Sequence, residues 1–123
     1  MREDDLVRLK AMHDAARRAL SFASGKSRAD LETDLSLALF TKKALEIMGT
    51  AATKATKECK THYEDFPWGS VSQFGRRINK RGFVKDDLDR MWRIITEELP
   101  RLAGLLEGIL AQETDGERDT GEG

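Results

Sequence analysis

Helical periodicity runs through this chain with few interruptions, and no other feature limits the fold as strongly. Only two prolines occur, Pro67 and Pro100, so long stretches contain no residue that would break a helix. Residues of high helix propensity dominate these stretches, and no segment alternates polar and apolar residues as a half-buried strand would. We therefore predict an all-α fold, an up-down bundle of four main helices of which the third is short.

Apolar residues at three- and four-residue spacing place these helices on the chain. The first helix is expected over residues 3–24, ended by Gly25, and the second from Ser27 or Asp30 to residue 59. A short helix follows the break at Pro67, and the last helix spans residues 85–112 with a kink at Pro100. The predicted buried faces contain Leu6, Leu9, His13, Ala16, Leu20 and Ala23; Leu31, Leu35, Ala38, Leu39, Leu45, Met48, Ala52 and Ala55; Trp68, Val71 and Phe74; and Leu88, Met91, Trp92, Ile95, Leu99, Leu102, Leu105, Leu106 and Ile109. Small residues from Gly49 to Ala55 would let another helix approach the second one closely.

The last eleven residues differ in composition from the rest of the chain. They carry five acids and one base, so without them the formal charge changes from −1 to +3. Such a segment cannot bury apolar area, and we expect a helical domain over residues 1–112 and a disordered acidic tail over residues 113–123. The tail either serves solubility alone or masks a basic surface.

Several classes of site have no support in the sequence. Cys59 is the single cysteine, and no zinc-binding spacing or glycine-rich phosphate loop occurs, so we expect neither a metal nor a cofactor. Asp86, Asp87 and Asp89 are explained by the preference of a helix N-terminus for acids. The chain has no apolar stretch long enough for a membrane span and no secretory signal, which indicates a cytoplasmic protein without a membrane partner.

One segment indicates a phosphate-binding surface. Residues 76–85 contain five bases and no acid, namely Arg76, Arg77, Lys80, Arg81 and Lys85. On a helix, bases four residues apart line adjacent ridges and attract a polyanion such as RNA. The alternative is a solvated basic face that is neutralised by the acids at the start of the next helix. No aromatic residue alternates with the bases, so recognition would depend on shape and phosphate contacts.

The two histidines are candidate proton donors or metal ligands. His13 lies within the apolar face of the first helix, where a hydrogen-bonded residue at a core or subunit boundary is the favoured interpretation. His62 stands beside Tyr63 and two acids before Pro67, and we interpret it as an exposed residue. Pro67, Trp68 and Trp92 are assigned to core or interface packing.

Four sequence motifs occur in a fixed order along the chain. They are D-D-L-V-R-L near the N-terminus, A-L-E-I-M-G-T-A-A from Ala44 to Ala52, F-P-W-G-S-V from Phe66 to Val71, and D-L-D-R-M-W ending at Trp92. With these motifs the chain resembles the HepT-like branch of the HEPN superfamily over nearly the whole predicted domain. The resemblance implies a helical bundle that forms a homodimer and cleaves RNA without a metal, with the signature motifs of both subunits facing a shared cleft. Members are often toxins encoded beside a minimal nucleotidyltransferase antitoxin, which can adenylylate the signature tyrosine.

The reactive residues of the family's signature are replaced in this chain. The signature reads R-N, three residues, H, one residue, Y; counted back from Trp92 without a gap, its arginine falls on Arg76 and its asparagine on Arg77. The histidine position is Arg81 and the tyrosine position is Phe83, while Thr50 stands where the family has glutamate in the second helix. Arginine stays protonated at all accessible pH values and cannot act as a general base, although it can hold a phosphate.

Two functions follow from this comparison of residues. The first is a catalytically impaired HEPN domain that binds RNA or a partner protein through its basic groove. The second is an active metal-independent endoribonuclease, with Arg76 stabilising the phosphate, a base that we do not recognise, and a nucleotidyltransferase antitoxin as its partner. A purely structural partner subunit is a third alternative. We predict the first.

Overall fold

The computed structural model describes the backbone of residues 2–75 and 83–122, and side chains as far as residue 114. The described residues form helices and no strand, so the predicted all-α class is confirmed. The elements are α1 (Glu3–Ala23), α2 (Asp30–Thr33), α3 (Leu35–Lys54), α4 (Lys57–His62), α5 (Trp68–Ser72), α6 (Lys85–Arg93), the π-helical segment η1 (Ile94–Glu98) and α7 (Leu99–Glu122).

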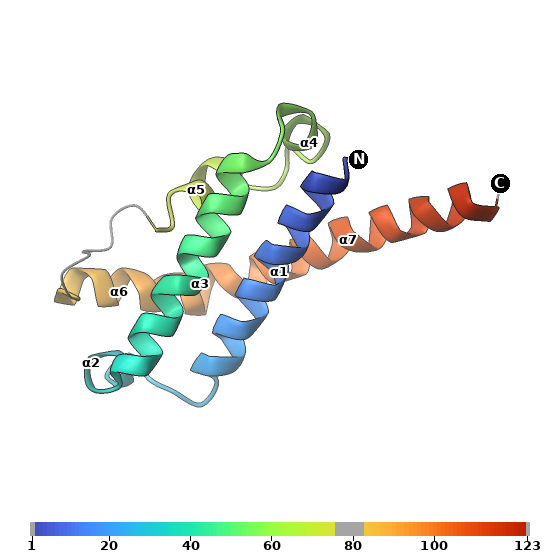
Figure 1. The fold of residues 1–123 in the computed structure, drawn as a ribbon. Helices are drawn as coiled ribbons and strands as arrows, with labels where there is room; N and C mark the ends of the chain where they lie inside the picture. Colours follow the sequence, from blue (N-terminus) through green and yellow to red (C-terminus); the bar gives the residue numbers. More distant parts are fainter. Residues whose placement is uncertain (1, 76–82, 123) are drawn as a thin grey trace.

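Two antiparallel helices, α1 and α3, form the centre of the fold (Figure 1). α6, η1 and α7 continue one another as a third long helix, which crosses this pair obliquely and packs on α1. The short α5 packs on α3. The core lies where these faces meet, and its fully buried side chains include Leu9, Met12, Leu45, Met48, Met91 and Leu106. The helices thus form one packed bundle, with an oblique last helix where we expected an up-down neighbour.

The prediction of one long second helix is wrong, because two capping residues divide it. Asp34 has an extended backbone, and its side chain accepts a hydrogen bond from the N–H of Leu37, which starts α3. Thr56 starts α4 in the same way through the N–H of Cys59. Leu35 and Leu39, both expected in the core, are 65% and 50% exposed, whereas Ala38 and Leu45 of the same predicted face are buried.

The first helix agrees closely with its prediction, and the last helix contains a π-helical segment just before the expected kink at Pro100. α1 ends at Ala23, and Gly25 has a φ of 76°, the left-handed conformation that a glycine adopts without strain. Pro100 has no N–H to donate, and the helix widens into η1 just before it, where the N–H of Leu99 bonds the carbonyl of Ile94.

The acidic segment begins within the packed domain. Glu113 accepts a hydrogen bond from the hydroxyl of Tyr63, at the end of α4. The helical backbone of α7 continues to Glu122 and leads away from the side of the molecule that carries α5 and α6 (Figure 1). The first residue of the predicted tail therefore contacts the packed helices, while the domain boundary at residue 112 and disorder of the segment in solution stay predictions.

Candidate functional site

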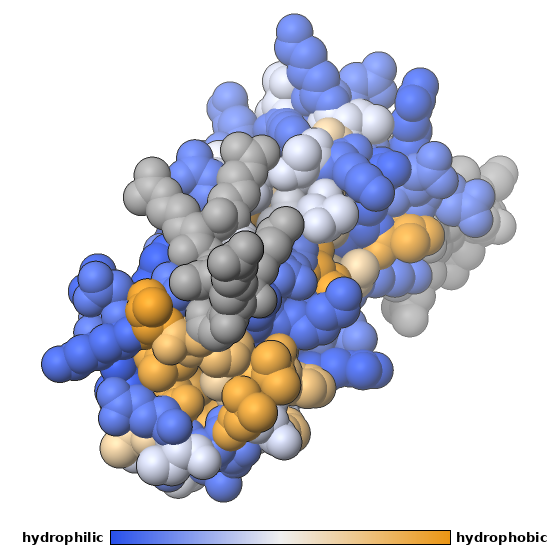
Figure 2. Space-filling view, turned by 60° about the vertical axis from the view of Figure 1, so that its left-hand side comes forward, coloured by the Kyte–Doolittle hydropathy of each residue, from blue (hydrophilic) through white to orange (hydrophobic). Residues whose placement is uncertain are grey.

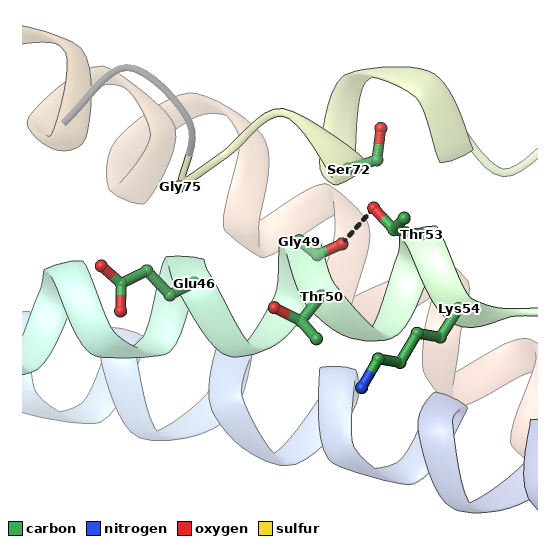
Figure 3. A pocket seen from close by; sticks show the side chains of 7 residues that line it. All are labelled: Glu46, Gly49, Thr50, Thr53, Lys54, Ser72 and Gly75. Atoms are coloured by element: carbon green, nitrogen blue, oxygen red, sulfur yellow. Dashed lines mark hydrogen bonds between the residues drawn. The ribbon is translucent and has the colours of Figure 1, made fainter.

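A groove of about 470 Å³ lies between α3 and α5 (Figure 3). Five of its lining residues belong to α3 and two to the α5 side: Glu46, Gly49, Thr50, Thr53, Lys54, Ser72 and Gly75. Glu46 and Lys54 stand at opposite ends of the groove. Gly75, which lines the groove, directly precedes the basic segment 76–85 in the sequence.

Two glycines allow α3 to approach the α5 side this closely. A Cβ atom on Gly49 would lie 3.3 Å from the carbonyl oxygen of Ser72. A Cβ atom on Gly75 would lie 3.0 Å from Cγ and 3.1 Å from Cα of Glu46, well inside the optimal separation of two carbon atoms. The expected close approach at the small residues of α3 is thereby confirmed at Gly49, and the width of the groove depends on both glycines.

Gly75→Ala is expected to lower the free energy of unfolding by about 1–3 kcal/mol, because the added methyl group must displace α3 at Glu46. The matched control is Gly104→Ala in α7, where a Cβ atom meets nothing within 4 Å. That variant is expected to gain about 0.5–1 kcal/mol through helix propensity. Urea unfolding measures both. Effects of the same sign would show that the contact between α3 and Gly75 is looser than described.

The polar groups of the groove are partly engaged with one another. The hydroxyl of Thr53 donates to the carbonyl of Gly49 at 2.9 Å, and that of Ser72 donates to the carbonyl of Gly69 at 2.8 Å. Both hydroxyl oxygens can still accept a hydrogen bond. The carboxylate of Glu46 lies 3.9 Å from the ammonium group of Lys42. Among the described residues, Glu46 and Lys54 are the ionisable side chains that line the groove.

Neither histidine lines the groove. Nε2 of His13 lies 3.1 Å from Oε1 of Glu107, a contact between α1 and α7. His13 is half-buried, so its interpretation as a hydrogen-bonded residue at the edge of the core is confirmed. His62 is exposed, as expected, but it ends α4 instead of lying in a loop, with its ring edge against Tyr63. Within one chain, the described part of the groove contains no histidine to exchange a proton.

Most of the basic segment falls outside the described residues. This applies to four of the predicted site residues: Arg76, Arg77, Lys80 and Arg81. The two described site residues follow them. Phe83 is half-buried against the core with the ammonium group of Lys42 6.0 Å from its ring centroid, and Lys85 is exposed at the start of α6. Gly75 and Phe83, the described residues on either side of residues 76–82, therefore lie near Glu46 and Lys42, four residues apart on α3.

The acids at the start of α6 are not all available to neutralise the basic segment. Oδ1 of Asp89 accepts a hydrogen bond of 2.6 Å from Nε of Arg28, and Nη2 of Arg28 donates to the carbonyl of Lys85. The charge of Asp89 is therefore paired with that of Arg28, just before α2. The alternative in which all three acids neutralise the basic face is weakened by this pairing.

Other candidate chemistry finds little support in the described part of the chain. No three His, Cys, Asp or Glu side chains are placed there to share a metal ion. Burial, followed by the charges of Asp5 and Glu113, raises the pKa of the Cys59 thiol to about 11, so it is not a thiolate near neutral pH. None of the described helices is long and apolar enough to cross a membrane.

Sequence reasoning identified the basic segment but not the groove beside it. Thr53, Lys54 and Ser72 are single polar residues on helix surfaces and carry no pattern of their own. The glycines were the sequence feature that could have indicated the groove, because a helix with Gly49 among small residues allows another segment to pack closely against it. In comparisons with known proteins, the chain matches no protein-family model, no curated protein and no solved structure.

Proposed function

We propose that this chain is a HepT-like HEPN domain that has lost catalytic power and binds RNA through the groove between α3 and α5 and the basic segment that follows it. The observation that carries the proposal is the position of Gly75, which joins the groove to five closely spaced bases. A groove whose lining adjoins such a segment in the sequence provides hydroxyl groups for the sugar–phosphate backbone, and the segment provides cations for its charge.

The groove also suits binding better than cleavage. RNA cleavage through the 2′-hydroxyl needs a group that exchanges a proton near pH 7, usually histidine. His13 is engaged by Glu107, His62 lies at the end of α4, and Arg81 occupies the family's histidine position. Phe83 has no hydroxyl for a nucleotidyltransferase to modify, so control of the family type would need another residue.

The proposal includes a homodimer, as the family resemblance implies. Leu35 and Leu39 of α3 expose apolar side chains, and Val84, just before α6, is 50% exposed. Figure 2 shows an area of apolar side chains, bordered by charged ones, on the side of the molecule where α3 and α6 begin. Apolar area of this kind is typical of surfaces that a partner covers.

RNA affinity tests this function directly. Arg76→Ala and Arg81→Ala are each expected to weaken the binding of a short single-stranded RNA by about tenfold, or about 1.4 kcal/mol, and to lower the salt dependence by about one unit of slope. Titration at several salt concentrations measures both quantities.

Arg18→Ala is the matched control, since it removes the same charge from α1, where Arg18 pairs with Asp14 at 3.1 Å. It should leave the affinity unchanged. Unchanged affinity in both Arg76→Ala and Arg81→Ala would overturn the proposed function and favour a structural partner subunit.

A further inference from the structure

A second cavity lies beside α5, against α6 and η1. Its volume is about 320 Å³. Its polar lining comes from Ser70 and Gln73 on one side and from Arg90, Arg93, Glu97 and Glu98 on the other. Ser72 and Gly75 line the groove, whereas Ser70 and Gln73 line this cavity, so the short α5 segment is shared by both.

Arg90 has hydrogen-bonding capacity that the described chain does not use. Its Nη2 donates to the carbonyl of Gln73 at 3.0 Å, which ties α6 to the end of α5. Its Nη1 is shielded from solvent and has no hydrogen-bond partner. A buried charged N–H group without an acceptor is costly, so an acceptor that reaches it after a small movement of the side chain would be strongly favoured.

Arg93 lies three residues further along α6, on the same face of the helix as Arg90. It is exposed, and none of the described acids forms an ion pair with it. Glu97 and Glu98 occupy the following turn. The cavity therefore has a positive end, next to α5, and a negative end, towards α7.

We propose that the positive end of this cavity binds a phosphate group of RNA between Arg90 and Arg93. The inference rests on the proposed function and extends it: the RNA backbone would cross α5 from the groove and the basic segment to α6. Two guanidinium groups are suited to a phosphate because each offers several N–H donors in a planar fork. The two glutamates disfavour an anion at the far end, which confines the phosphate to the end beside Gln73.

Arg93→Ala tests the site, because Arg93 is exposed and holds no other element in place. We expect its affinity for a short single-stranded RNA to fall by about five- to tenfold and its salt slope to fall by about one unit. Glu97→Gln combined with Glu98→Gln should change the affinity in the opposite direction, raising it at low salt, since negative charge near the phosphate is removed. Arg18→Ala on α1 is again the control of equal charge.

These measurements distinguish a failure of this phosphate site from a failure of the proposed RNA binding as a whole. Unchanged affinity in Arg93→Ala, with weakened binding in Arg76→Ala and Arg81→Ala, would overturn the cavity as a phosphate site and leave the groove intact. Unchanged affinity in all three variants would overturn both. In the natural chain, the side-chain N–H signals of Arg90 should shift in NMR spectra when RNA is added. Signals that stay in place at saturating RNA would also overturn the site.

Discussion

Replacing Arg81 by histidine and Phe83 by tyrosine in one variant is expected to raise the cleavage of RNA by about 10²- to 10⁴-fold over the natural chain. Histidine, with a pKa of about 6.5, can exchange a proton at neutral pH, which arginine cannot do. Phe83 is half-buried against the core, and tyrosine adds one hydroxyl group to a ring of the same shape. The variant should therefore fold like the natural chain and carry the acid–base pair that the proposed function regards as lost.

Cleavage of a mixed tRNA and mRNA substrate in EDTA measures the gain. Adding Arg76→Ala to the double variant is the control, and it should abolish the gain because the phosphate contact is lost. A folded double variant with no gain would mean that the geometry around the signature has changed along with its residues. Cleavage by the natural chain, lost in Arg76→Ala, would contradict impaired catalysis and require a base from elsewhere.

The sequence predicted those helices whose limits depend on local signals. Gly25 ends α1 because a glycine alone determines that turn. The break at Thr56 was missed because its hydroxyl, which caps α4, is held by Asp5 of α1, 51 residues away along the chain. The break at Asp34 was missed because apolar spacing continues through it, which also placed Leu35 and Leu39 on the expected buried face beside Ala38.

Of the candidate site, too, only the part that depends on local sequence was predictable. Charges that are contiguous in sequence, such as those of segment 76–85, are visible without a structure. The groove is not, because it exists only where Gly49 of α3 meets the chain at Ser72 and Gly75. The cavity at Arg90 depends likewise on a contact between α6 and the end of α5. Sites formed between elements need the packing before their residues can be recognised.

Asp5 is a buried acid whose side chain is expected to be costly to remove from the described core. It is 2% exposed, and its carboxylate accepts hydrogen bonds from the N–H of Thr56 at 2.9 Å and from its hydroxyl at 2.6 Å. Thr56 in turn caps α4, so one acid of α1 determines where α3 ends and α4 begins. Nη1 of Arg8 lies 3.6 Å from the same carboxylate.

Asp5→Ala should lower the free energy of unfolding by about 3–5 kcal/mol, because two hydrogen bonds to a charged group are lost and the N–H of Thr56 is left without its acceptor. Urea unfolding followed by circular dichroism measures the loss. Asp4→Ala is the matched control: it removes the same charge from the neighbouring, exposed position in the first turn of α1, and it should cost less than about 1 kcal/mol. Equal losses in the two variants would show that Asp5 acts only through its charge.

The same contact should also make stability depend on pH in acid. Burial raises the pKa of the Asp5 carboxyl, but the hydrogen bonds from Thr56 and the charges of Arg8 and Arg2 outweigh burial and hold the pKa below its ordinary value of 3.8. A carboxyl with a lowered pKa in the folded state stabilises the fold fully above its unfolded pKa, and this stabilisation is lost as the pH falls through the folded value. The difference in unfolding free energy between the natural chain and Asp5→Asn should therefore be constant above about pH 5 and shrink below about pH 4. A difference that grows on acidification would mean that the folded protein prefers the protonated carboxyl, and that Thr56 does not hold its charged form.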